Sequence, residues 1–158
     1  MLRHCKRRVL TDEKPQHIAV VGSRAFPNES VVETFVRALP RNAVVVSGAA
    51  KGVGTWAEEA ARAASLKTLI FHADWEGLGR RAGPLRNEEI IKHAERLVAF
   101  WDGDSRGTLN AIILAGEKGI PVEIFGTNGE LVGPARALGR ARELGGCDAL
   151  EKGRKGGR

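Results

Sequence analysis

Short apolar runs alternate with amphipathic segments along the first four fifths of the chain. The apolar runs are continuous rather than alternating, which is typical of strands that are buried on both faces of a sheet. Five such runs are predicted to form strands: 17–21, 44–46, 68–71, 97–101 and 121–125. The segments between them carry apolar residues at helical spacing. These four predicted helices are 31–39, 53–65, 85–95 and 107–118.

The order of these elements predicts a fold. Successive strands joined by single helices require right-handed crossovers and a parallel sheet with helices on both faces. We therefore expect an α/β, doubly wound, three-layer sandwich with five parallel strands in the order 3-2-1-4-5. Leu131, Ala135 and Leu138 predict one more helix over 130–144. Sheets of this type bind ligands beyond the carboxyl ends of their strands.

The positive charge of the chain lies at its two ends. The 158 residues carry a net charge of +6, but residues 1–16 hold five Lys or Arg against two acids, and residues 151–158 hold four against one. The body between them is neutral. We predict a flexible basic tail over 1–16, one ligand-binding domain over 17–145 and a second flexible basic tail over 146–158. Basic tails are either solvated ends or weak contacts to nucleic acid.

Composition indicates a cytoplasmic protein with no membrane partner. No apolar run approaches the roughly 18 residues that a membrane-spanning helix needs, and no secretory signal follows the basic start. Cys5 and Cys147 match no metal or redox spacing, so both are expected to be reduced thiols. The four histidines are scattered, and the sequence predicts no metal site.

Two glycine-containing loops follow predicted strands. Gly22-Ser23-Arg24 offers close backbone approach, a hydroxyl and a guanidinium for a phosphate, or it is a tight turn with an exposed arginine. The second loop, 47–54, contains three glycines ahead of a helix, whose free N–H groups favour an anion. Its alternative is a glycine turn packed on the sheet. The candidate ligand-binding residues of this loop are Ser47, Gly48, Lys51 and Gly52.

A third loop follows the fourth predicted strand. Ser105, Gly107 and Thr108 offer hydroxyls and backbone amides to a phosphate at the start of a helix. Asp102 and Asp104 are less suited to an anion. They are candidates for contacts to a ribose, a base edge or a metal, and helix capping is the alternative for at least one of them.

The segment between the third and fourth strands carries two further candidates. Trp75 is expected in the core, with stacking on a base as the alternative. Arg86 falls in the first turn of a predicted helix, where a cation opposes the helix dipole and favours an anion as partner. A salt bridge to Glu88, Glu89 or Asp74 is the alternative reading of Arg86. Asn87 is grouped with Arg86 as a candidate ligand contact.

Four ordered motifs together resemble a known superfamily. They are Val20-Val21-Gly22-Ser23-Arg24, Ser47-Gly48-Ala49-Ala50-Lys51-Gly52, Ala82-Gly83-Pro84-Leu85-Arg86-Asn87, and Ala99-Phe100-Trp101-Asp102-Gly103 continuing through Ser105-Arg106-Gly107-Thr108. The set resembles the SMF/DprA–LOG superfamily of Rossmann-like domains, in particular its small stand-alone bacterial and phage members. The resemblance covers about residues 17–125. It implies a Rossmann-like fold, glycine loops that bind nucleotides or nucleotide derivatives, and a homodimer.

The superfamily contains enzymes and DNA-binding proteins, and the sequence leaves the choice open. The phosphoribohydrolases of the superfamily release a base from a nucleoside monophosphate, and Arg86 matches their catalytic arginine. Two departures count against that activity. The second loop ends in Val53-Gly54 where the family has a hydrophobic residue and Asp, and Ala111 stands at the position of the enzymes' glutamate.

We therefore expect a binding module or sensor for a nucleotide-type phosphate ligand, with no cofactor assigned. The first alternative is an enzyme that cleaves an N-glycosidic bond, with Arg86, Asp102 and Asp104 as catalytic candidates and Glu88 as another source of a carboxylate. The second alternative is a single-stranded DNA-binding protein of the DNA-processing branch. The neutral body argues against DNA as the main ligand, because grooves that track phosphates need concentrated positive charge.

Overall fold

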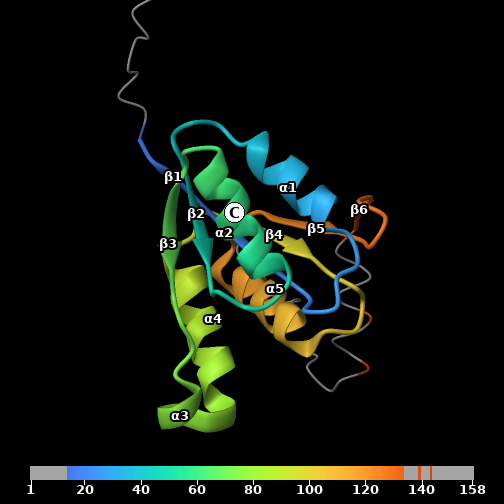
Figure 1. Ribbon diagram of the computed structural model, residues 1–158. Helices are drawn as coiled ribbons and strands as arrows, with labels where there is room; N and C mark the ends of the chain where they lie inside the picture. Colours follow the sequence, from blue (N-terminus) through green and yellow to red (C-terminus); the bar gives the residue numbers. More distant parts are fainter. Residues whose placement is uncertain (1–13, 134–138, 140–142, 144–158) are drawn as a thin grey trace, which may run out of the picture.

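The computed structural model describes residues 14–133 together with residues 139 and 143. A six-stranded sheet with the order β3-β2-β1-β4-β5-β6 forms its centre (Figure 1). Strands β1 to β5 are parallel, which confirms the predicted parallel sheet and its order, and β6 adds an antiparallel strand beside β5. The strands are β1 (Gln16–Gly22), β2 (Ala43–Ser47), β3 (Lys67–Ile70), β4 (Arg96–Phe100), β5 (Val122–Phe125) and β6 (Leu131–Val132).

Helices cover both faces of the sheet, so the predicted three-layer sandwich is confirmed. Helices α1 and α2 pack together over one face, and α4 and α5 pack together over the other. A short exposed helix, α3, lies at the end of the molecule beyond β3 (Figure 1). The helices are α1 (Glu29–Arg37), α2 (Val53–Ala63), α3 (Trp75–Leu78), the 3₁₀ helix η1 (Gly79–Arg81), α4 (Ala82–Lys92) and α5 (Arg106–Lys118).

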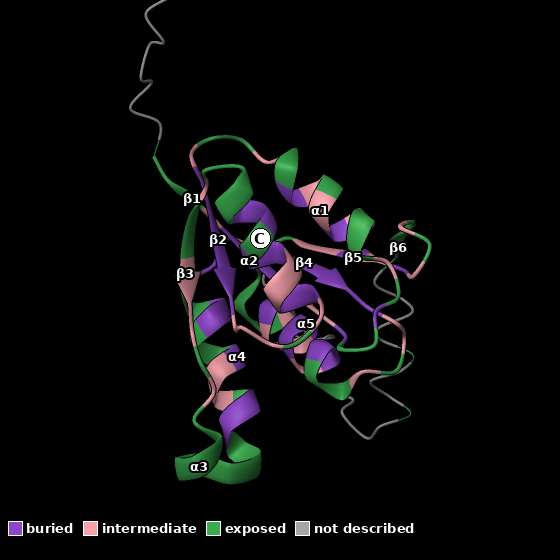
Figure 2. Cartoon of the chain, in the orientation of Figure 1, coloured by how far each residue is buried: buried purple, intermediate pink, exposed green. Residues whose placement is uncertain are grey.

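Alternate residues of the central strands supply two separate cores. In β1, Ile18 and Val20 pack with the apolar face of α1 and α2, whereas Ala19 packs with the apolar face of α4 and α5. All three side chains are at most 1% exposed. Figure 2 shows the central strands buried and α3 exposed. Burial on both faces explains why the strands read as continuous apolar runs in the sequence.

Three local expectations were wrong. The helix predicted over 85–95 begins earlier, at Ala82, because Pro84 is only its third residue, where a proline removes no helical hydrogen bond. Helix α3 and η1 were not predicted. Leu131–Val132 form β6 rather than the start of the helix predicted over 130–144. Within the rest of that range the structure describes residues 133, 139 and 143, of which the last two are helical.

Helices α4 and α5 are tied together at both ends. Near the start of α5, the side chain of Asn87, from the middle of α4, donates to the Gly107 carbonyl at 3.1 Å and to Asn110 Oδ1 at 3.0 Å. At the end of α5, Lys118 Nζ donates to three carbonyls at and just beyond the end of α4, those of residues 91, 92 and 94, at 2.7–2.9 Å. Several bonds at each end fix α4 against α5.

The predicted tails, 1–16 and 146–158, lie outside the described residues except for residues 14–16. Residue 16 already belongs to β1. In the part of the chain that the structure describes, no helix is long and apolar enough to cross a membrane.

Candidate functional site

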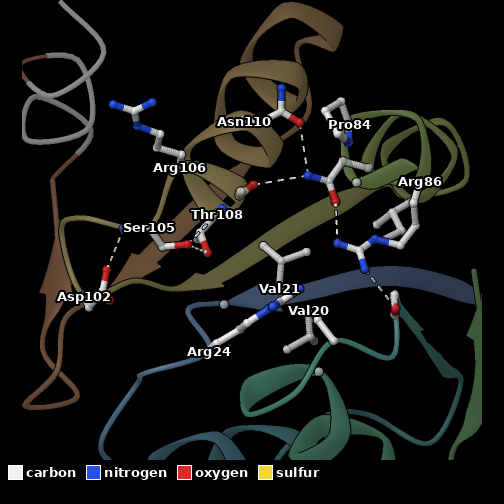
Figure 3. A pocket seen from close by; sticks show the side chains of 18 of the residues that line it. Val20, Val21, Arg24, Pro84, Arg86, Asp102, Ser105, Arg106, Thr108 and Asn110 are labelled. Carbon is white, nitrogen blue, oxygen red and sulfur yellow. Dashed lines mark hydrogen bonds between the residues drawn. The ribbon is translucent and has the colours of Figure 1, made fainter. Parts of the chain in front are cut away.

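A cleft of about 530 Å³ opens at the carboxyl ends of the parallel strands, where this type of sheet is expected to bind ligands (Figure 3). The ends of β1, the loop after β2, the first turns of α4 and α5 and the loop after β4 form its walls. Eight residues predicted to bind ligand line it: Gly22, Arg24, Gly48, Arg86, Asn87, Ser105, Gly107 and Thr108. Their binding role stays a prediction.

Besides the short α3, whose Trp75 lines the cleft and whose first turn contains Glu76, three helices begin at this cleft, and none of the three has an acidic residue in its first turn. These helices are α2, α4 and α5. The first N–H groups of a helix have no partner within the helix, and the helix dipole places partial positive charge there. Helix α1, which does not line the cleft, begins instead with Glu29. The first N–H groups of these three helices favour an anion in the cleft, which Asp102 and Asp104 also line.

The glycine at position 48 makes room for an arginine. A Cβ atom at Gly48 would lie 2.7 Å from Arg86 Nε and 2.8 Å from Arg86 Cδ. The guanidinium therefore occupies the space that any other residue at position 48 would fill. It is held there by a hydrogen bond from Nη1 to the Gly48 carbonyl at 3.2 Å. The second loop thus acts by admitting Arg86 into the cleft wall.

Arg86 is short of partners. Its Nε is buried and has no hydrogen-bond acceptor, and within the described residues the guanidinium makes no ion pair. The salt bridge to Glu88, Glu89 or Asp74 is therefore absent. Burial of the guanidinium and the positive charge of Arg24 lower the pKa of Arg86. An anion bound between the two arginines would remove both penalties.

Asp102 caps the loop that leads into α5. Its Oδ1 accepts hydrogen bonds from the backbone N–H groups of Asp104 and Ser105, both at 2.9 Å. Burial raises the pKa of Asp102, but these hydrogen bonds and the Ser23 side chain outweigh burial, so the pKa lies below its ordinary value. Asp102 thus orders the loop, whereas the N-cap of α5 is Ser105. An ionised, engaged carboxylate is poorly suited to act as a general acid.

Two predicted hydroxyl contacts lie behind the cleft wall. Ser23 and Ser47 are both 0% exposed and do not line the cleft. Ser23 Oγ accepts from the Asp102 N–H at 3.1 Å and ties the loop after β1 to the loop after β4. Ser47 Oγ accepts from the Ala49 N–H at 3.4 Å. We had expected these hydroxyls to face the ligand; the hydrogen bonds show that they shape the loops.

Two more residues of the second loop also stand back from the cleft. Gly52 has φ +81°, and a Cβ there would lie 2.9 Å from the Arg24 carbonyl. It therefore serves a turn and a close approach between loops. Lys51 is exposed and does not line the cleft. The predicted phosphate loop contributes backbone and space rather than side chains.

The start of α5 is pre-arranged. Ser105 Oγ accepts from the Thr108 N–H at 3.4 Å and lies 3.1 Å from Thr108 Oγ1. A Cβ at Gly107 would meet nothing within 4 Å, so this part of the wall is open to a ligand. Sequence reasoning missed Arg106 and Asn110, which also line the cleft. The helical spacing from Gly107 to Asn110 could have indicated the latter.

The arrangement suits the binding of an anion better than acid–base chemistry. Ala111, at the position where the resembling enzymes have a glutamate, is 1% exposed and offers no polar group. Glu88 is exposed and does not line the cleft. Among the residues that the structure describes, no group of three or more His, Cys, Asp or Glu could hold a metal ion.

Comparison with known proteins gives both sequence and structural relatives. The family model of DNA recombination-mediator protein A matches residues 7–96. Gene 61 protein of Mycobacterium phage D29 is 31% identical over 121 residues, which cover 70% of this chain and 97% of that protein. The family match includes Arg24, Gly48 and Arg86 and ends before the loop that leads into α5.

Two solved structures share the fold. DNA processing protein A from Streptococcus pneumoniae has a TM-score of 0.64 and 21% identity, covering 89% of this chain and 60% of that one. The Helicobacter pylori protein of the same name, whose single-stranded DNA binding mode is the subject of its structure, has a TM-score of 0.62 and 20% identity, covering 85% and 75%. The present chain thus spans 60% of the S. pneumoniae chain.

Proposed function

Because the chain belongs to the DNA recombination-mediator protein A family, we propose that it binds single-stranded DNA and holds a backbone phosphate in the cleft. Arg24 and Arg86 supply the charge, and the first turns of α2 and α5 supply backbone N–H groups. This proposal takes up the second alternative drawn from the sequence. The family membership supports it better than the small-nucleotide interpretation.

The observation that carries the proposal is that Arg86 lines the cleft without a negatively charged partner among the described residues. Arg86 is a half-buried cation with a buried, unpartnered Nε beside a second cation, and no carboxylate among the described residues pairs with it, which is costly in the free protein. Arg86 and Arg24 both line the cleft, so the negative charge of a phosphate bound there would offset the repulsion between them. DNA backbone phosphates carry one negative charge each, which matches this need.

From the sequence we had taken the neutral body as an argument against DNA as the main ligand. The distribution of charge in the structure weakens that argument. The positive groups are concentrated: Arg24, Arg86 and Arg106 line one cleft together with three helix starts that have no acids in their first turns. Of the two acids in the cleft lining, Asp102 has its carboxylate engaged by backbone N–H groups. A net charge summed over the body conceals this local concentration.

A nucleotide or nucleotide derivative is a second candidate, because a cleft of about 530 Å³ is large enough for a single nucleotide. The two candidates differ in the length of ligand that they require. A mononucleotide site should be saturated by one nucleotide, whereas a DNA site gains affinity as further phosphates and bases engage.

Fluorescence anisotropy of the full-length chain, with a labelled thymidylate of about 15 nucleotides, tests the proposal. We expect Arg24→Gln and Arg86→Gln to weaken binding by about tenfold or more each, because each removes a charge-assisted hydrogen bond worth about 1.5–3 kcal/mol. The dependence of log Kd on log salt should become shallower by about 0.7 for each arginine lost.

Arg62→Gln is the matched control. Arg62 is exposed in the last turn of α2, far along the helix from the cleft, so the variant removes the same charge without touching the site. It should leave affinity within about twofold of wild type. Equal loss in all three variants would mean that binding is diffuse and would overturn the proposed site. Saturation by thymidine monophosphate with no gain on lengthening would favour the second candidate.

A further inference from the structure

The rim of the cleft carries an exposed tryptophan. Trp75, which we had expected in the core from the sequence, is 49% exposed and lines the cleft together with Arg86. It begins α3, the short helix that lies at one end of the molecule (Figure 2). A half-exposed indole is costly in water, and tryptophan is common where one face of the ring receives a ligand. The position of Trp75 therefore requires an explanation other than packing.

The indole ring of Trp75 lies against the first turn of α4. A Cβ at Gly83, in the first turn of α4, would lie 3.2 Å from Trp75 Cη2, so the glycine lets the far edge of the ring approach the helix closely. The backbone that carries Trp75 is also ordered, because Asp74 Oδ1 accepts a hydrogen bond from the Gly77 N–H at 2.9 Å and so caps the start of α3. These contacts hold the ring in place while leaving about half of it accessible.

Two cations follow the tryptophan. Arg80 and Arg81 lie in η1, both are exposed, and neither makes an ion pair within the part of the chain that the structure describes. After the capping residue Asp74, the segment presents in sequence order the indole of Trp75, the exposed carboxylate of Glu76, the guanidinium groups of Arg80 and Arg81, and then the half-buried Arg86. Alternation of cations and an aromatic ring is the arrangement that binds a single-stranded backbone with its bases stacked.

We propose that Trp75 is a stacking platform for a nucleobase of single-stranded DNA. The base belongs to a nucleotide whose phosphate lies near Arg86, and Arg80 and Arg81 contact a neighbouring phosphate. This inference rests on the proposed function. It adds a base-binding position at the rim of the phosphate cleft, and it makes the preferred ligand a segment of at least two nucleotides. Because every base offers a π face, the position selects unpaired bases rather than a sequence.

The test compares thymidylate oligomers with oligomers of the same length that lack bases. Trp75→Ala should weaken binding to thymidylate by about 5- to 150-fold, the equivalent of about 1–3 kcal/mol per stacked base. The same variant should bind the abasic oligomer as wild type does. Trp75→Phe keeps an aromatic face and should retain most of the affinity. Leu78→Ala, which removes another exposed apolar side chain from α3, is the matched control and should leave affinity unchanged.

Intrinsic fluorescence supplies an independent readout. Of the three tryptophans, Trp101 is 3% exposed, Trp56 is partly buried and does not line the cleft, and Trp75 is 49% exposed at the rim, so a stacking base should quench mainly the emission of Trp75. Quenching by thymidylate should therefore be largely lost in Trp75→Phe.

Each outcome of this test decides something. Normal binding of thymidylate by Trp75→Ala overturns the inference and leaves the proposed function standing. Equal loss on the thymidylate and abasic oligomers also overturns it, because it makes Trp75 a support for the cleft. No binding of either oligomer by wild type overturns both proposals.

Discussion

Arg86→Met should stabilise the free protein while it removes the phosphate contact. Methionine follows the course of the arginine stem without a charge or a donor. The substitution removes a buried Nε that has no acceptor and a cation that lies close enough to Arg24 for the charges to repel. Stability and binding should therefore change in opposite directions.

The magnitude follows from two opposing contributions. Removal of an unsatisfied buried donor recovers about 1–3 kcal/mol. Loss of the hydrogen bonds from Nη1 to the Gly48 carbonyl at 3.2 Å and from Nη2 to Asn87 Oδ1 at 3.5 Å, both of which are long, costs about 1 kcal/mol in total. The net gain should be about 1 kcal/mol in the free energy of unfolding, or about 2–4 °C in Tm for a chain of this size.

The assay is thermal unfolding of wild type, Arg86→Met and Arg62→Met, each with and without an excess of thymidylate oligomer. Wild type should gain stability with DNA, because a ligand that binds only the folded state raises Tm. Arg86→Met should start higher and gain less. Arg62→Met, exposed on α2, should follow wild type. A Tm of Arg86→Met several degrees below wild type without DNA would refute the reasoning and make Arg86 a structural residue.

Four other perturbations test separate parts of the structure. Gly48→Ala should displace the guanidinium of Arg86 and weaken oligomer binding about tenfold with the fold intact, as circular dichroism would show; unchanged affinity would contradict the close approach. Asp102→Ala should lower the free energy of unfolding by about 1 kcal/mol at pH 7. Because the folded pKa of Asp102 lies below its ordinary 3.8, this contribution is present above that value and is lost as pH falls through the folded pKa, so urea unfolding curves of the two proteins should converge in acid. Wild type should release no base from nucleoside monophosphates, as chromatography would show, and rapid release would restore the enzyme alternative. A chain of residues 16–146 should bind mononucleotides as the full chain does in calorimetry, and a large loss would assign the tails a role.

The sheet could be predicted because burial leaves a clear mark on sequence. Strands covered on both faces are continuous apolar runs, and single helices between them fix direction and order. β6 could not be predicted in this way, since it has two residues, of which Leu131 is 66% exposed. Such a strand depends on its pairing with β5 rather than on its own apolar content.

The cleft was predictable in position but not in the roles of its residues. Parallel strands bring their carboxyl ends together, so three loops distant in sequence had to share one edge. Which side chains reach the cleft depends on packing: Ser23 and Ser47 are turned into the wall, whereas Trp75 is turned out to the rim. A sequence identifies a glycine loop without saying whether the free space serves a ligand or, as at Gly48, a neighbouring arginine.

The double attachment of α4 to α5 has a consequence for how binding changes the motion of the protein. The bonds of Asn87 near the start of α5 and of Lys118 at its end hold the two helices as one body, so the wall that carries Arg86 and Thr108 is already ordered before a ligand arrives. Little conformational entropy remains to be lost there on association. The loss falls instead on the exposed α3 and η1, whose backbone amides should gain protection from hydrogen exchange when DNA binds, while those of α4 and α5 change little.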